Sequence, residues 1–194
     1  LKTVTVTDGQ ITDTGMVSVP DIDIEQLRYL DSSKCSFDTN VNAISSGGLI
    51  TVRGSYEFKD YRKSEVNVVN LEIEIPEGCK YVSDSLRING KSAANVSEED
   101  KIVRVPIDKK NAAFTYNIKP IEYGIISTSA KINFIASGEY RKEQIGAADV
   151  EIPYVTLSAP SATSEKNITV SGLSVPNTTV GIYDGDHRIG TAVS

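Results

Sequence analysis

Apolar and polar residues alternate in several short runs of this sequence, and this alternation restricts the fold more than any other feature. In LITVRGSYEF (residues 49–58) every second residue is apolar except Gly54, and in VNLEIEIPEG (residues 69–78) the alternation ends at Pro76. Successive side chains of a strand point to opposite faces of a sheet, so such runs are typical of strands with one buried face. We expect the buried faces to carry Ile50, Val52, Tyr56 and Phe58 in the first run, and Val69, Leu71, Ile73 and Ile75 in the second.

Further runs of the same kind follow, at residues 85–92, 101–107, 112–120 and 125–136, with a tight-turn dipeptide at Asn89-Gly90. The chain has nine Tyr, no Trp and a single Met among its 194 residues, and Val, Ile and Thr are abundant. These are the residue types that fit a pleated surface. Short strands separated by turn signals predict an all-β fold, an antiparallel Ig-like β-sandwich.

Helical periodicity is confined to one stretch, DIEQLRYLDSS at residues 23–33. Ile24, Leu27 and Leu30 or Tyr29 would share one face of a helix there. The wider stretch SVPDIDIEQLRYL is read equally well as an alternating strand that runs into a loop, and the pattern leaves both interpretations open.

The charge balance argues against nucleic acid and anionic membrane surfaces as partners. The formal net charge is -6, and Lys and Arg form no basic run, so phosphate groups would be repelled. No apolar stretch approaches the roughly 20 residues of a membrane span. The first residues, Leu-Lys-Thr-Val, lack an initiator Met and the apolar core of a signal peptide, so we expect the sequence to be a piece of a longer protein.

The order of strands and turns from Leu71 to Tyr140 resembles the conserved repeat domain of bacterial surface proteins. The segments that carry the resemblance are LEIEIPEGCKYVSDSLRINGKSA, KIVRVPI, AAFTYNIKPIEYG and STSAKINFIASGEY. The sequence departs from that pattern at Cys79, where an aliphatic residue or Thr is more usual, and the residues before Leu49 have no equivalent. The resemblance implies a secreted or wall-attached bacterial protein with modules in series, and it implies no catalysis.

The C-terminal stretch from Pro160 to Ser194 is similar to the opening half of bacterial Ig-like modules of adhesins and cell-surface proteins. Ile168, Val170 and Gly172 would lie on one strand and Val180, Ile182 and Tyr183 on the next, with a tight turn at Asp184-Gly185. A complete module needs about 80 to 100 residues, so we expect a second, incomplete Ig-like β-unit that is truncated at Ser194. The Pro- and Ser-rich segment VEIPYVTLSAPSATSEK predicts the division, with a surface-repeat domain at residues 1–154 and the Ig-like unit at residues 155–194.

Two small sets of residues are candidates for cross-linking or ligand contact. Cys35 and Cys79 could form a disulfide in an oxidising exterior, or could be two separate free thiols. Sugar-binding sandwiches stack their ligands on exposed aromatic rings, and without Trp that role would fall to tyrosines. Three or more coplanar, exposed rings would favour glycan binding, whereas buried or scattered rings would favour a stalk; the candidates are Tyr56, Tyr61, Tyr123 and Tyr140.

Catalytic and metal-binding material is sparse. His187 is the single histidine and adjoins a predicted hairpin turn, so we expect it to be solvated. Glu72 and Glu74 are expected on a solvated strand face rather than as a catalytic pair. Neither acidic cluster, Asp21-Asp23-Glu25 or Asp184-Asp186, has the loop spacing of a known calcium motif. Surface-protein sandwiches sometimes carry a Lys–Asn isopeptide bond, and Lys2 or Lys34 with Asn133 could be imagined in that role, but plain solvent-facing side chains are the simpler interpretation.

The sequence therefore predicts a non-catalytic structural or adhesive module of a bacterial extracellular or cell-wall protein, acting as a stalk or spacer in a tandem array. The alternative is a carbohydrate- or protein-binding module of a secreted multidomain protein. No enzyme activity, cofactor or metal is expected. The expected partners are neighbouring modules of the same polypeptide and a host or cell-wall protein or glycan, with no nucleic acid and no membrane insertion.

Overall fold

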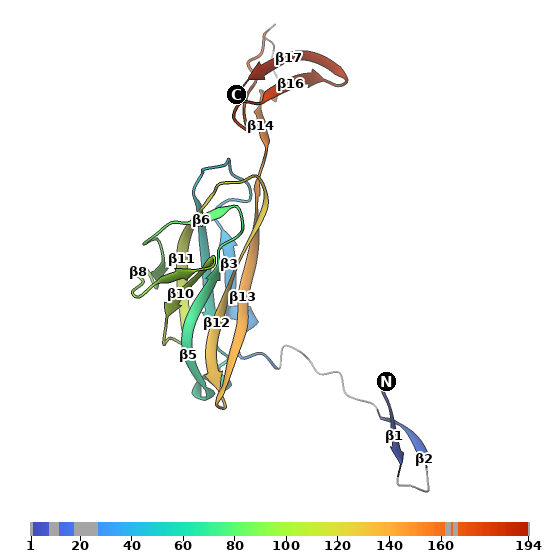
Figure 1. The fold of residues 1–194 in the computed structure, drawn as a ribbon, viewed down its shortest axis with the longest axis vertical. Helices are drawn as coiled ribbons and strands as arrows, with labels where there is room; N and C mark the ends of the chain where they lie inside the picture. The colour runs from blue at the N-terminus through green and yellow to red at the C-terminus, as the bar shows by residue number, and fades with distance from the viewer. Residues whose placement is uncertain (1, 8–11, 18–26, 162–163, 165–166, 194) are drawn as a thin grey trace.

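Two antiparallel sheets packed face to face form the body of the protein (Figure 1). The computed structural model describes residues 2–7, 12–17, 27–161, 164 and 167–193, and for residues 2–7 and 12–17 it describes the backbone. One sheet has the strand order β13-β12-β5-β10-β9, and the other has the order β3-β4-β11-β7-β8, with β6 also paired to β11. The strands are β3 (Ser36–Thr39), β4 (Ile50–Glu57), β5 (Val66–Glu74), β6 (Cys79–Tyr81), β7 (Arg87–Ile88), β8 (Lys91–Ser92), β9 (Ser97–Glu99), β10 (Ile102–Pro106), β11 (Asn111–Pro120), β12 (Gly124–Ala136) and β13 (Glu139–Ile152). The prediction of an all-β antiparallel Ig-like sandwich is confirmed.

The alternating runs form the two inner faces as predicted, except at Val69, which is half-buried and lies outside the core, next to the register shift between β12 and β5. In β4 the residues Ile50, Val52 and Tyr56 are buried, as is Phe58 directly after the strand, and in β5 the residues Leu71 and Ile73 are fully buried. Facing side chains from β10, β11 and β12 complete one continuous hydrophobic core. Burial of this apolar surface is the main favourable term in the folding free energy.

Gly54 interrupts the apolar row of β4 for a steric reason. It pairs with Phe114 of β11, and a Cβ atom at Gly54 would lie 2.3 Å from Cζ of that ring. The phenyl ring therefore occupies the space that a side chain at Gly54 would need. Phe114 is 1% exposed and stacks with Tyr116 on the same strand, at a centroid distance of 6.5 Å.

The chain passes through the sandwich from one pole to the other. Leu30 forms a bridge with Phe58 at the same end as the β12–β13 turn, and we call this end the N-pole. At the opposite end, the C-pole, Gly124 of β12 pairs with Ile152 of β13. β13 leads directly out of the C-pole into the C-terminal unit (Figure 1).

Smaller β-units flank the sandwich at its two ends (Figure 1). On the N-terminal side, β1 (Lys2–Thr7) and β2 (Thr12–Val17) form a two-stranded sheet. The C-terminal unit consists of two two-stranded sheets, β14 (Val155–Ser158) with β15 (Ser171–Ser174), and β16 (Thr179–Asp184) with β17 (His187–Val193). Residue 154 lies in the short connection between β13 and β14; that the chain divides there into two domains stays a prediction.

The helix expected at residues 23–33 falls partly outside the described residues. Within the described part, Leu27 is helical, whereas Leu30 is already paired with Phe58. A short 3-10 helix, η1 (Ser32–Lys34), follows and is capped by the side chain of Asp31. A second one, η2 (Asp60–Glu65), connects β4 to β5.

Candidate functional site

The four candidate tyrosines do not form a shared ligand platform. Tyr56 is 1% exposed and its hydroxyl donates to the carbonyl oxygen of Lys109, so it belongs to the core and the structure contradicts its ligand-stacking role. Tyr61 and Tyr140 are exposed near the N-pole, on η2 and at the start of β13. Tyr123 lies at the C-pole and stacks on Tyr154, with ring centroids 5.3 Å apart. The candidate rings are thus buried or scattered, the arrangement expected of a stalk.

Cys35 and Cys79 are free thiols, and the disulfide interpretation is wrong. Cys79 pairs with Pro120, at one end of β11. Ser36, next to Cys35, pairs with Ser55 of β4. Ser55 in turn pairs with Ala113, near the other end of β11. At about 3.4 Å per residue the two cysteines are separated by roughly 24 Å along the sheet, far beyond the roughly 7 Å limit between disulfide Cα atoms. Burial raises the pKa of the Cys79 thiol to about 11.

Most of the charged candidates are exposed to solvent or lie outside the described residues. His187 is exposed beside the β16–β17 turn, as predicted, and Asp184 and Asp186 are exposed with it. The cluster Asp21-Asp23-Glu25 lies outside the described residues. Among the residues whose side chains are described, no three His, Cys, Asp or Glu side chains gather as a metal site would require.

Glu72 departs from its prediction, because it is 4% exposed rather than solvated. Lys142 Nζ donates to its Oε1 at 2.7 Å, and Arg104 Nε donates to its Oε2 at 3.2 Å. Asn133, which is 1% exposed, donates to Asn70 Oδ1 at 2.6 Å and to Glu72 Oε2 at 3.4 Å. Long side chains from β10 and β13 thus cover a polar site on the outer face of β5 and β12. The sequence pattern correctly predicted that Glu72 lies on the outer face of the sheet. It did not predict that Lys142 and Arg104 cover Glu72 there.

The isopeptide pairing of Lys34 with Asn133 is also contradicted. Lys34 Nζ donates to Glu57 Oε1 at 3.2 Å, at the end of β4, whereas Asn133 is on β12 in the opposite sheet. Lys2 is in β1, and its side chain is outside the described part of the structure. In the structure the Asn133 side chain instead donates hydrogen bonds to the side chains of Asn70 and Glu72.

At the N-pole, the first segment of the sandwich is held by the last strand, an arrangement that we call the N-clamp. The Glu143 carboxylate accepts hydrogen bonds from the backbone N–H groups of Tyr29, at 2.7 Å, and Leu30, at 3.0 Å. The Tyr29 ring packs on Phe134 with a centroid distance of 5.1 Å, and the Arg62 guanidinium lies 4.5 Å from the Tyr29 centroid. A carboxylate that accepts two backbone N–H groups makes charge-assisted hydrogen bonds, the stronger kind.

At the C-pole, a second contact joins the same two segments, and we call it the C-clamp. The N–H of Ile44 donates to the carbonyl oxygen of Glu151 at 3.0 Å, and the N–H of Glu151 donates to the carbonyl oxygen of Asn42 at 2.9 Å. Ala43 and Glu151 form a parallel bridge. The first and last segments of the sandwich therefore run side by side in the same direction and are joined near both poles.

Between the two clamps, β3 and β13 pack closely against each other. A Cβ atom at Gly146 of β13 would lie 2.4 Å from Cβ of Phe37 of β3. Because Gly146 has no side chain, the two strands approach more closely than two larger residues would allow. No local pattern could predict the clamps from the sequence, since Glu143 and Tyr29 are separated by 114 positions.

Within the described residues no helix has the length and apolar character needed to cross a bilayer. No protein-family model matches this chain, and no curated protein matches it. The resemblance to a particular surface-repeat family therefore stays a prediction.

Several solved structures are similar in fold. The major pilin subunit BcpA of Bacillus cereus is 14% identical with a TM-score of 0.49, over 81% of this chain and 49% of the pilin chain. Domains D2 and D3 of the major pilin SpaD of Corynebacterium diphtheriae are 10% identical with a TM-score of 0.47, over 70% of this chain and 58% of that chain. The collagen-binding domain of the surface protein RspB of Erysipelothrix rhusiopathiae is 18% identical with a TM-score of 0.41, over 54% of this chain and 41% of that chain. This chain thus spans less than two thirds of each of these structures.

Proposed function

We propose that this chain is a non-catalytic structural module of a bacterial extracellular or cell-wall protein, which acts as a stalk or spacer in a tandem array. The observation that carries the proposal is the course of the chain through the sandwich. It enters at the N-pole and leaves at the C-pole, and its first and last segments run parallel between the two clamps. The neighbouring modules of the same polypeptide are its principal partners.

Tension applied through the neighbouring modules would pull Leu30 outward at the N-pole and Ile152 outward at the C-pole. The force would then run along the strands and would load both clamps and the interface between β3 and β13 at the same time. Hydrogen bonds loaded together must break together, whereas those of an unzipped hairpin break one pair after another. This geometry suits a module that must keep its length under load.

A binding module is less well supported. A sugar-binding face would present several coplanar exposed rings, but Tyr56 is buried and Tyr123 lies at the opposite pole from Tyr61 and Tyr140.

The N-clamp provides the test. We expect Glu143→Ala to lower the force at which the sandwich unfolds when the whole chain is pulled from its ends in single-molecule force spectroscopy. The physical reason is that two charge-assisted hydrogen bonds to the N–H groups of Tyr29 and Leu30 disappear. Gln144→Ala is the matched control, since only the backbone carbonyl of this exposed neighbour accepts a hydrogen bond, from Arg28. Equal unfolding forces for wild type and Glu143→Ala would contradict the proposed role of the N-clamp.

A further inference from the structure

A two-residue connection joins the sandwich to the C-terminal unit, and we call this connection the joint. β13 ends at Ile152 and β14 begins at Val155, so Pro153 and Tyr154 form the joint. Among the described strands, those of the sandwich pair within its two sheets and β14–β17 pair with one another, so no ladder crosses the joint. The ring of Pro153 fixes its own φ angle and favours an extended Ile152. Rotation is therefore limited to a few torsion angles of Pro153 and Tyr154.

A contact between two rings spans the joint. On the sandwich side, the backbone N–H groups of Ile121 and Glu122 donate to the carbonyl oxygen of Gly78 at 2.7 and 3.2 Å. These bonds hold the loop between β11 and β12, which carries Tyr123. The Tyr123 ring stacks on Tyr154, with centroids 5.3 Å apart and an angle of 21° between the ring planes. One ring is thus fixed to the sandwich, and the other belongs to the joint.

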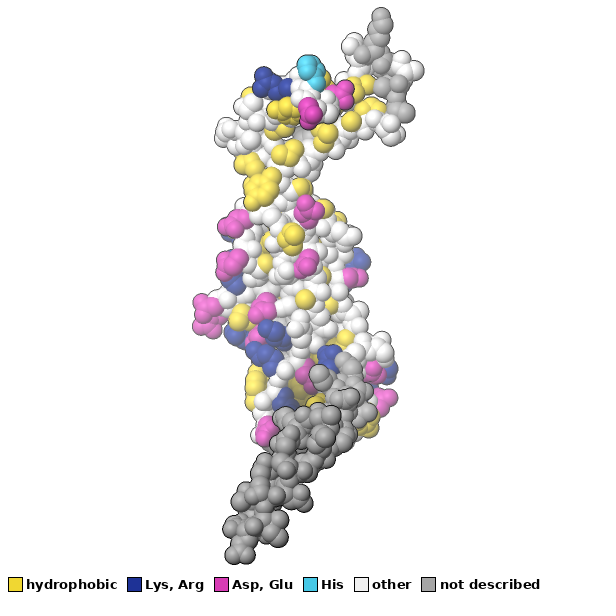
Figure 2. Space-filling model, turned by 90° about the vertical axis from the view of Figure 1, so that its right-hand side faces the viewer, with side chains coloured by type: hydrophobic (Ala, Val, Ile, Leu, Met, Phe, Trp, Pro, Cys, Tyr) yellow, Lys and Arg dark blue, Asp and Glu magenta, His cyan; other side chains and the backbone are white. Residues whose placement is uncertain are grey.

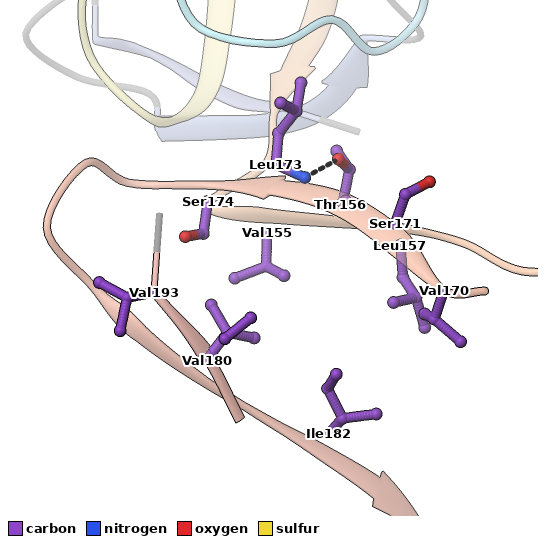
Figure 3. Close-up of a pocket in the computed structure, with 12 residues that line it drawn as sticks. Val155, Thr156, Leu157, Val170, Ser171, Leu173, Ser174, Val180, Ile182 and Val193 are labelled. Atoms are coloured by element: carbon purple, nitrogen blue, oxygen red, sulfur yellow. Dashed lines mark hydrogen bonds between the residues drawn. The ribbon is translucent and has the colours of Figure 1, made fainter. Parts of the chain in front are cut away.

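Beside the stacked rings the joint is loosely packed. Leu173 points away from the interior of the C-terminal unit and toward the sandwich, whereas Val155 and Leu157 point the opposite way (Figure 3). Tyr154 and Leu173 are each 61% exposed, and Figure 2 shows hydrophobic side chains gathered where the molecule narrows between the sandwich and the C-terminal unit. A cavity of about 180 Å³ lies here, lined by Ser45, Ser46 and Tyr123 on the sandwich side and by Leu173, Ser174 and Pro176 on the other. The two sides therefore lack the close packing found inside a domain.

The parts on either side of the joint are each held by their own hydrogen bonds. The loop that forms the sandwich wall of the cavity is tied to β11, because the N–H of Gly47 donates to the carbonyl oxygen of Pro120 at 3.0 Å. Across the joint, the N–H of Leu173 donates to Thr156 Oγ1 at 3.0 Å and connects β15 to β14 (Figure 3). A small contact between two connected bodies favours relative motion, and a few residues of the connecting segment absorb such motion.

We propose that Pro153 and Tyr154 form a hinge and that the stack of Tyr123 on Tyr154 is its latch. In the latched state, which this structure shows, the rings are stacked. In the released state the rings separate, and the C-terminal unit turns about the joint. A stacked aromatic pair favours the state that contains it by about 2- to 12-fold beyond the effect of the area it buries. Such a bias leaves both states populated.

The hinge does not depend on the stalk function, because the equilibrium between its two states exists without load. Within a stalk, the hinge would let the next module turn while the sandwich keeps its length. The measurement below applies no force, so its failure and the failure of the proposed stalk function can be told apart.

The distance between two spin labels, measured by double electron–electron resonance in frozen solution, reports the two states. Ala147 of β13 and Thr191 of β17 are exposed, and both are replaced by Cys for labelling. The full chain also carries Cys35→Ser, whereas Cys79 is buried and stays. We expect two distance populations, of which the larger corresponds to the stacked rings.

Removal of either ring should shift this equilibrium. We expect Tyr123→Ala and Tyr154→Ala each to raise the ratio of released to latched molecules by about 2- to 12-fold or more. Because the two rings act as a pair, the double variant should shift the ratio no further than the larger single effect. Tyr140→Ala is the matched control, since Tyr140 is also an exposed tyrosine but lies near the N-pole, and it should leave the ratio unchanged.

Three results would overturn the proposal. A single narrow distance in wild type and in both variants would show that the joint is rigid. A broad distribution that neither variant changes would show a free tether without a latch, and single effects that add in the double variant would show that the rings do not act through each other. Because Tyr154 lies outside both sheets of the sandwich, Tyr154→Ala remains a valid test if circular dichroism shows that Tyr123→Ala disturbs the sandwich.

Discussion

Replacement of Phe134 by Ala is expected to lower the free energy of unfolding by about 3–5 kcal/mol, the usual cost of removing a buried phenyl ring. Phe134 is fully buried, and its ring meets Phe58 edge-on at 5.1 Å and Tyr29 at 5.1 Å. The substitution opens a cavity between the two sheets and removes the surface on which Tyr29 packs. The N-clamp should therefore loosen together with the core.

Denaturant unfolding followed by tyrosine fluorescence and circular dichroism measures this change. Ile135→Ala is the matched control, because Ile135 is the next residue on β12 and is 38% exposed on the outer face. Its cost should stay below about 1 kcal/mol, the span of strand preferences. A loss of less than about 1 kcal/mol for Phe134→Ala would mean that the aromatic cluster does not hold the sheets together.

Replacement of Glu72 by Gln is expected to cost about 1–3 kcal/mol at neutral pH, the range for leaving buried polar groups without their partner. The larger losses known for fully buried ion pairs do not apply, because the Lys142 and Arg104 side chains are 44% and 35% exposed. Burial raises the pKa of Glu72. The hydrogen bond and charge of Lys142, followed by the hydrogen bonds of Arg104 and Asn133, lower this pKa by more than burial raises it. The net pKa in the folded protein is therefore below the ordinary value of 4.5.

The sign of the pH dependence follows from this lowered pKa. A carboxyl group with a lowered folded-state pKa contributes stability that is fully present above its unfolded pKa and is lost as the pH falls through the folded pKa. The stability difference between wild type and Glu72→Gln should thus be constant above about pH 5 and should shrink toward zero in stronger acid. Unfolding curves at several pH values measure this stability difference. Glu77→Gln is the control, because Glu77 is exposed and lies shortly after the end of β5. A difference that persists unchanged at low pH would show that the charge of Glu72 is not the cause.

The inner faces of the sandwich could be predicted from the sequence because their strands alternate cleanly. β13 could not, although it is the longest strand, with 14 residues. It is an edge strand of its sheet, and only Ile145, Val150 and Ile152 of its side chains are buried. The run EYRKEQ at its start has the charged composition that edge strands use to avoid further pairing, so alternation gives little signal there.

The polar sites depend on contacts between distant parts of the sequence. Glu72 looked solvated because its neighbours in sequence alternate, but Lys142 is 70 positions away and covers it. A register shift next to Asn133, where β12 pairs with β5, adds to the irregularity of this face. The clamps have the same origin, since their partners meet only when the first and last segments of the sandwich lie side by side.

The most direct test of the proposed spacer role compares two directions of pulling on the same folded chain. Handles near Tyr29 and Ile152 load the two clamps along the strands, whereas handles at Tyr123 and Tyr154, whose stacked rings lie together at the C-pole, peel β13 from β12 one residue pair at a time. We predict a several-fold higher unfolding force for the first pair of handles. Equal forces, or a lower force along the strands, would contradict the claim that this sandwich is built to carry tension between its poles.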